Sequence, residues 1–268
     1  MKQKIQPVSR TLPNGKLALL DSACMFRYFS ARIPRWYPGN LLADLRIHDH
    51  SRLLYKKSIA YQLTLKDARN TSRRIVMLRG NVPSLHTTIE AHTADRALRA
   101  IWRLDAEKEL PISRPLGYDE HLRILFYEEV PGETLTSVLQ RSPRAGLPYV
   151  AQAGRWLAHL HAANICSGRH RGVRREHTEA YFFSLNYGQY YKRCQPRARE
   201  IVGNFFALRE RFRLPIEREA RLLHGDYGPK NIIVNAKSKS LTVIDFGNAW
   251  RYDPMSDLAN ALMQLEYI

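Results

Sequence analysis

The stretch Leu222–Asn248 constrains this chain more than any other part of it, and it reads LLHGDYGPKNIIVNAKSKSLTVIDFGN. Two short apolar runs, Ile232–Val234 and Leu241–Ile244, flank a polar turn at Ala236–Ser240. Short runs that are rich in β-branched residues and separated by turn formers predict a β-hairpin. Because the strands of a hairpin run antiparallel, the residues before the first strand and after the second are expected to lie side by side.

Polar side chains gather at these two ends of the predicted hairpin. His224, Asp226, Lys230 and Asn231 come before the first strand, and Asp245 follows the second. Two carboxylates and a carboxamide suit Mg²⁺, which takes one or two carboxylates and fills its other positions with phosphate oxygens and water. The sequence therefore predicts that Asp226, Asn231 and Asp245 converge on one point. The alternative is an ordinary hairpin with polar loops.

The order of these residues resembles a known family. The pattern H-x-D-x-x-x-x-N followed by D-F-G is the phosphoryl-transfer signature of protein-kinase-like enzymes. With Gly225 after the histidine and Ile244 before the second aspartate, it is most similar to the aminoglycoside phosphotransferase and choline kinase family. The segment Asp253–Ala259, DPMSDLA, resembles the start of a helix in the same family, where Asp257 is expected to anchor the loop backbone. Three ordered motifs at matching spacing favour the family over a chance hairpin.

The resemblance implies a role for each polar residue. Asp226 is the expected catalytic base, which accepts the proton of a substrate hydroxyl, and His224 is expected to brace the catalytic loop. Asn231 and Asp245 are the expected magnesium ligands beside ATP or GTP. Lys230 is expected either to contact phosphate or to be a solvated loop lysine, with equal weight.

A second segment resembles the hinge of the same family. Ile124–Val130 reads ILFYEEV and is followed by a Pro-Gly turn. The resemblance implies that Tyr127 lines the back of an adenine pocket, while the backbone C=O of Glu128 and N–H of Val130 bind the base. Taken alone, the segment predicts a strand followed by a turn. A hinge at about residues 128–132 would divide the chain into lobes at residues 1–127 and 128–268.

The N-terminal lobe departs from the family in two ways. No glycine occurs in Ile47–Lys57, where a loop covering the phosphates is expected, so contacts there depend on side chains. No lysine occupies the predicted strand Ile75–Leu78, and Arg79 is the nearest cation. Arg79 is expected either to bind phosphates, since guanidinium suits bidentate contacts, or to be a surface arginine at the strand end.

Hydrophobic periodicity predicts the remaining elements. Strands are expected at Leu45–Asp67 and Arg73–Arg79, and helices at Thr93–Leu104, Tyr149–Ala163, Arg197–Arg213 and Ser256–Ile268. The apolar stripe of the first helix is expected to comprise Ala97, Leu98, Ile101, Trp102 and Leu104. The resemblance to kinase-like folds implies that this helix carries a glutamate paired with the strand cation, and here Asp95 and Glu90 are the only candidates. The histidine in the second helix, His161, is expected to be a satisfied packing residue rather than a ligand.

Composition and charge limit the choice of partners. The formal net charge of +17 favours anionic partners such as nucleotide phosphates. Cys24–Arg46 interleaves aromatic rings with arginines, which is typical of a nucleic-acid stacking surface or of rings packed on a lobe. We favour packing and do not expect nucleic acid as a partner. Three widely spaced cysteines, no membrane span and no signal-peptide core indicate a cytoplasmic enzyme.

The sequence therefore predicts an α+β, two-lobe, protein-kinase-like fold with a small β-rich N-terminal lobe and a mainly helical C-terminal lobe. The chain closes on Leu265, Tyr267 and Ile268, which indicates a truncation relative to the family's further helices. The expected activity is Mg²⁺-dependent transfer of the γ-phosphoryl of ATP or GTP to a small-molecule hydroxyl, as in aminoglycosides, choline or sugars. The alternative is a weakly active or inactive kinase-like protein that binds nucleotide or regulates, suggested by the missing glycines and lysine.

Overall fold

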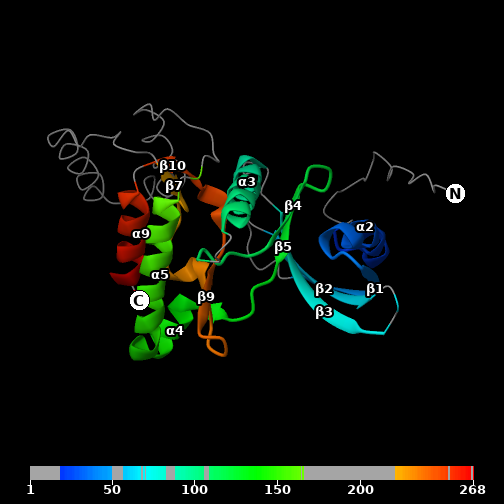
Figure 1. Ribbon diagram of the computed structural model, residues 1–268, viewed down its shortest axis with the longest axis horizontal. Coiled ribbons are helices and arrows are strands. Elements are labelled where there is room, and N and C mark those ends of the chain that lie inside the picture. Colours follow the sequence, from blue (N-terminus) through cyan, green and yellow to red (C-terminus); the bar gives the residue numbers. More distant parts are fainter. Residues whose placement is uncertain are drawn as a thin grey trace, which may run out of the picture.

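The structure is a computed structural model that describes residues 19–49, 57–67, 69, 71–82, 88–105, 109–163, 165, 221–252, 254–266 and 268. Most of the segment expected to cover the phosphates, and the predicted helix Arg197–Arg213, lie outside these residues. Figure 1 shows two bodies, one holding strands β1–β3 with helix α2 and the other holding helices α4, α5 and α9. Each has its own cluster of buried apolar side chains.

The first body is built on a five-stranded antiparallel sheet in the order β1-β2-β3-β5-β4. Its strands are β1 (Asn40–Asp49), β2 (Lys57–Asp67), β3 (Arg73–Val82), β4 (Pro115–Asp119) and β5 (Ile124–Glu128). The single strand predicted at Leu45–Asp67 is wrong, because β1 and β2 are separate strands that pair with each other. The predicted alternation within β2 is confirmed, since Ile59, Tyr61, Leu63 and Leu65 are all fully buried.

Helix α2 (Ser22–Trp36) covers one face of this sheet. The helix begins where the carboxylate of Asp21 accepts the N–H of Cys24 at 2.6 Å, the usual N-cap arrangement. Its buried side chains include Phe29, whose ring centroid lies 5.5 Å from that of Phe126 on β5. The packing interpretation of the aromatic and arginine-rich segment is therefore confirmed for these rings, although Phe26 keeps 36% of its surface exposed.

Helix α3 (Thr88–Leu104) belongs to the second core rather than to the core under α2. Ala94, Ala97, Leu98 and Ile101 pack there against apolar residues of the C-terminal elements. The predicted stripe is wrong at its end, because Trp102 and Leu104 are 49% and 61% exposed. Residues 102–104 are all exposed, so the last turn of the helix extends past the core.

The second body combines helices with two small sheets. Its helices are α4 (Leu135–Arg141), α5 (Pro143–Ala162) and α9 (Met255–Glu266). One sheet has the order β6-β8-β9, formed by Glu133–Thr134, Ile232–Asn235 and Ser240–Val243, and the other pairs β7 (Arg221–Leu223) with β10 (Trp250–Tyr252). The predicted hairpin is confirmed as β8–β9, in which Ile232 pairs with Val243. Among the described residues, no helix is long and apolar enough to cross a membrane.

Candidate active site

The chain crosses from one sheet to the other between Glu128 and Glu133. The Glu128 N–H donates to the Arg114 C=O at 3.0 Å, and the Glu129 N–H donates to the Met77 C=O at 2.8 Å. Gly132 has φ +143°, and a Cβ there would lie 2.3 Å from the carbonyl oxygen of Val234, so only glycine fits. Within the described part of the chain, the Val130 N–H takes part in no backbone hydrogen bond.

His224 follows strand β7 and is fully buried. Its Nε2 lies 2.8 Å from the carbonyl oxygen of Ile244, and its Nδ1 accepts the N–H of Asp226 at 3.3 Å. Since the carbonyl can only accept, Nε2 carries the proton and the ring is neutral. Burial lowers the pKa of His224, which agrees with this neutral form. The histidine thus links the two ends of the hairpin, as a bracing role requires.

Gly225 brings the same loop against the residues after β9. Its φ is +81°, and a Cβ would lie 2.0 Å from the carbonyl oxygen of Asn248. Any other residue would combine a strained backbone with a clash against main chain, which cannot move aside cheaply. The glycine between His224 and Asp226 is therefore a requirement of the geometry.

Asp257 holds this loop from the start of helix α9, and only 1% of its surface is exposed. Its carboxylate accepts the N–H of His224 at 2.8 Å and the N–H of Gly225 at 2.9 Å. His161 of helix α5 lies 3.2 Å from the same carboxylate. The expected anchoring role of Asp257 is confirmed, and the described contact of His161 agrees with a satisfied packing histidine.

The carboxylate of Asp226 lies close to polar side chains from its own loop and from helix α9. Its Oδ2 lies 3.1 Å from Nδ2 of Asn231 and 2.9 Å from Nζ of Lys230. Nδ2 of Asn231 also donates to the backbone carbonyl of Asp226 at 2.8 Å, which fixes the loop between them. Nδ2 of Asn260 on α9 lies 3.5 Å from Oδ1. Sequence reasoning missed Asn260, although its place one turn after Asp257 on a helix was a usable signal.

Asp245 lies beside this group. The N–H of Ile244 donates to the C=O of Asn231 at 3.0 Å, which brings the residue after it next to the loop. Asp245 has φ +64°, a left-handed conformation that aspartate tolerates better than most residues. Burial raises the pKa of the Tyr127 hydroxyl, and the charge of Asp245 raises it further. The ring of Tyr127 on the hinge strand therefore lies within electrostatic reach of Asp245.

The donor set at this point suits magnesium. Asn231 and Asp245 offer a carboxamide and a carboxylate, the oxygen ligands that Mg²⁺ prefers. Among the described residues, no group of three or more His, Cys, Asp or Glu could hold a metal ion. An ion here would therefore need oxygens from a substrate as well, which is how Mg²⁺ binds in nucleotide sites.

Arg79 pairs with an acid of the hinge and not with Asp95 of helix α3. Its Nη2 lies 2.6 Å from Oε1 of Glu129 in the hinge, and both side chains are about a quarter exposed, at 26% and 25%. Asp95 instead pairs with Arg99 on its own helix at 2.9 Å, and the side chain of Glu90 lies outside the described residues. Arg79 of strand β3 is thus ion-paired with Glu129 of the hinge.

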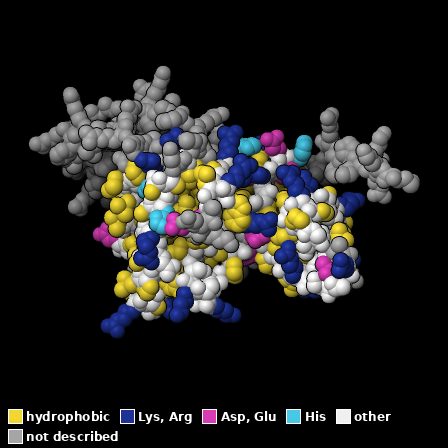
Figure 2. All heavy atoms as spheres, in the orientation of Figure 1, with side chains coloured by type: hydrophobic (Ala, Val, Ile, Leu, Met, Phe, Trp, Pro, Cys, Tyr) yellow, Lys and Arg dark blue, Asp and Glu magenta, His cyan; other side chains and the backbone are white. Residues whose placement is uncertain are grey.

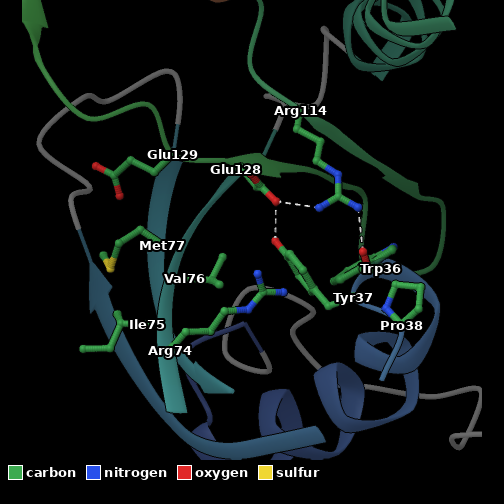
Figure 3. A pocket seen from close by; sticks show the side chains of 10 residues that line it. All are labelled: Trp36, Tyr37, Pro38, Arg74, Ile75, Val76, Met77, Arg114, Glu128 and Glu129. Carbon is green, nitrogen blue, oxygen red and sulfur yellow. Dashed lines mark hydrogen bonds and ion pairs between the residues drawn. The ribbon is translucent and has the colours of Figure 1, made fainter. Parts of the chain in front are cut away.

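An open pocket of about 510 Å³ lies beside the hinge, between strand β3 and the end of helix α2 (Figure 3). Glu128 points into it and accepts the hydroxyl of Tyr37 at 2.7 Å and Nη1 of Arg114 at 2.8 Å. Figure 2 shows Lys and Arg side chains on both bodies of the molecule. The positive charge on this face is therefore not confined to one of the two bodies.

The fold and the loop geometry are those of the protein-kinase-like class. The model of the phosphotransferase enzyme family matches residues 60–267, and the chain belongs to this family. Among curated protein sequences, none matches the chain significantly.

Solved structures show the same fold. The GDP complex of a mutant aminoglycoside 2'-phosphotransferase IIIa is 15% identical with a TM-score of 0.56, over 89% of this chain and 77% of that one. A type VIII aminoglycoside 3'-phosphotransferase is 21% identical with a TM-score of 0.54, over 92% and 83%. The Plasmodium vivax ethanolamine kinase is 15% identical with a TM-score of 0.52, over 97% and 69%. The predicted α+β kinase-like fold is confirmed.

Proposed function

We propose that this protein transfers the γ-phosphoryl group of ATP or GTP to a hydroxyl of a small molecule. The observation that carries the proposal is the carboxylate of Asp226, held 3.1 Å from Nδ2 of Asn231 and 2.9 Å from Nζ of Lys230. A carboxylate positioned beside a cation and a magnesium-binding amide is the arrangement that phosphoryl transfer uses. Family membership supports the same reaction class.

In this proposal Asp226 orients the acceptor hydroxyl and takes its proton as the new P–O bond forms. His224 stays neutral and holds the loop by its hydrogen bond to Ile244. Lys230 is 55% exposed and can turn from Asp226 toward a phosphate, where its charge would offset that of the transferred group. Catalysis is then mostly positioning and charge neutralisation.

Asn231 and Asp245 would hold Mg²⁺. The bound ion would neutralise the charge of the nucleotide phosphates. Asn231 donates a hydrogen bond to the carboxylate of Asp226, which would hold the proposed catalytic base at a constant distance from this proposed metal ligand.

The hinge would hold the nucleotide base. The backbone C=O of Glu128 and the N–H of Val130 are the proposed contacts, and Tyr127 would line the back of the pocket. Contact of Arg79 with phosphate would require separation of its ion pair with Glu129, whose Oε1 lies 2.6 Å away. The free energy needed to separate this ion pair would reduce the net gain from a contact between Arg79 and phosphate.

The acceptor is proposed as a hydroxyl-bearing small molecule, such as an aminoglycoside, choline or a sugar. The similarity to aminoglycoside phosphotransferases and to an ethanolamine kinase supports this class. We propose residues 1–127 and 128–268 as the two lobes, and the cytoplasm as the compartment.

The test is a screen of acceptor-dependent ATP and GTP turnover with Asp226→Asn as the variant. The substitution keeps the shape and removes the charge, so kcat should fall roughly 10²–10⁴-fold, the usual worth of a positioned base. Nucleotide affinity should change little, because the proposed nucleotide contacts lie elsewhere. A variant that turns over an accepted substrate as fast as the parent would overturn the assignment.

A second candidate is a kinase-like protein that binds nucleotide without efficient transfer. The specific observation that favours it is the ion pair between Arg79 and Glu129. Arg79 is the cation nearest the strand position where a lysine is expected, and this ion pair keeps its charge from a phosphate. It predicts nucleotide binding with no acceptor-dependent turnover in the parent protein.

A further inference from the structure

Helix α9 turns polar side chains toward the loop after β7 and apolar side chains away from it. Asp257, Asn260 and Gln264 follow one another at intervals of three and four residues, so they share one face of the helix. Leu258 and Leu262 lie on the other side and keep 39% and 58% of their surface exposed. A helix that served only packing would turn its apolar side inward. The inward polar face therefore indicates a role in the loop beyond packing.

The amide of Asn260 lies between the side chain of Asp226 and the backbone of the next residue. Its Nδ2 donates to the Tyr227 C=O at 3.1 Å and lies 3.5 Å from Oδ1 of Asp226. Tyr227 is itself fixed, because its hydroxyl donates to the Ala153 C=O at 2.7 Å and its ring stacks on Trp156 with centroids 5.5 Å apart. The amide is therefore held by a firmly packed residue, one long hydrogen bond from the proposed base.

The two carboxylate oxygens of Asp226 have different neighbours. Oδ2 lies 2.9 Å from Nζ of Lys230 and 3.1 Å from Nδ2 of Asn231, whereas Oδ1 has Asn260 as its one donor among the described contacts. The last torsion of an aspartate is soft, so donors on both oxygens are needed to fix the plane of the carboxylate. In the proposed function Lys230 turns toward a phosphate, which opens its position on Oδ2 to another donor. Asn231 and Asn260 are then the described donors that keep the carboxylate in place.

We propose that Asn260 is a positioning residue, which holds Oδ1 of Asp226 so that Oδ2 stays turned toward the acceptor hydroxyl when Lys230 leaves. The inference rests on the proposed function, because it needs Asp226 as the base. The hydroxyl oxygen bonds to the γ-phosphorus as the bond from that phosphorus to the nucleoside diphosphate breaks, and the hydroxyl proton passes to Oδ2. A carboxylate that is free to turn would meet the hydroxyl in the productive orientation less often, so the amide acts on kcat.

The test is a double-mutant cycle in the full chain, with Mg²⁺ and ATP or GTP, and with water, choline, kanamycin and glucose as the acceptors. Asn260→Leu keeps the size of the side chain and removes the amide. It should lower kcat roughly 3–10-fold, the range for one hydrogen bond of ordinary strength, while Kd for the nucleotide stays the same. In the Asp226→Asn background it should change kcat little, because a residue that acts through the carboxylate then has no charged base to position.

Gln264→Leu is the matched control, since it makes the same change one turn along the same face, where the amide lies against Gly228 and has no described contact with Asp226. It should keep the parent kcat. An equal loss from Asn260→Leu in both backgrounds would mean that Asn260 only stabilises the fold, and this result would overturn the inference.

An unchanged kcat for Asn260→Leu in the parent background would also overturn it. In both cases the proposed function stands if Asp226→Asn lowers kcat. A parent protein that turns over none of the acceptors overturns the function and the inference together. If Asn260→Leu does not fold, Asn260→Ser carries the same cycle with a smaller change.

Discussion

At the scale of single residues, the loop depends on a histidine that stays uncharged. His224 uses one ring nitrogen as a donor to Ile244 and the other as an acceptor from Asp226. Protonation of the second nitrogen would turn that acceptor into a donor facing another donor. The lowered pKa of His224 follows from its burial, and it makes the loop sensitive to acid.

This pKa predicts how stability changes with pH. The unfolded chain binds a proton at His224 near the ordinary pKa of 6.5, and the folded chain binds it only at lower pH. The folded state therefore loses stability as pH falls below about 6.5. His224→Gln should lower stability near neutral pH, and the difference from the parent should shrink at pH 5.5. Urea unfolding of both proteins at pH 7.5 and 5.5 measures this difference in the free energy of unfolding. The same difference at both pH values would contradict the prediction.

The residue contacts were only partly predictable from the sequence. The spacing of Asp226 and Asn231 was enough to predict that they meet, because four residues of a tight loop separate them. The partner of Arg79 was not predictable, since Glu129 follows a different strand, β5, and only the register of β3 and β5 brings them together. The roles proposed for the site residues remain predictions.

At the scale of elements, helix α9 supports the loop that follows strand β7. Asp257 at its start binds two loop N–H groups, and Asn260 one turn later donates to the carbonyl of Tyr227 at 3.1 Å. Local patterns predicted the helix and the hairpin. They did not predict the break between β1 and β2, because both strands carry the same alternation.

Removal of this support should cost stability. Asp257→Ala leaves the buried N–H of His224 and the half-buried N–H of Gly225 without an acceptor, so the free energy of unfolding should fall by about 2–4 kcal/mol, more than one hydrogen bond to a charged group contributes. Asp44→Ala is the control, since Asp44 is 58% exposed and its pairing with Arg46 is long, at 3.8 Å. Urea unfolding measures both. Equal losses for the two variants would contradict the anchoring role.

At the scale of the whole molecule, the candidate site lies where the two bodies meet. Tyr127 belongs to the five-stranded sheet and lies within electrostatic reach of Asp245, which follows strand β9 in the other body. A nucleotide held by the hinge and by the ion ligands would contact both bodies. The order of motifs predicted this fold, whereas the packing of α3 on the second core depends on contacts that no local pattern encodes.

Binding of Mg²⁺ should therefore strengthen nucleotide binding. Kd for ATP and for GTP should be lower with Mg²⁺ than with EDTA, and Asp245→Asn should remove at least about tenfold of that gain, in line with changes at metal sites. Glu120→Gln, an exposed acid in the turn after β4, is the control. Calorimetric titration is the measurement. The same nucleotide affinity with and without Mg²⁺ in the parent would remove the metal assignment.

The anchor of the loop also has a consequence for biosynthesis. Asp257 lies 33 residues after His224, and the two backbone groups that it binds have no other acceptor among the described contacts. A ribosome makes the loop first and the anchor later, while the intervening residues are still inside the exit tunnel. The nascent chain thus carries the complete sequence of this loop for some time before the loop can take its shape. Until helix α9 emerges and docks, the loop of a growing chain stays open to chaperones and proteases.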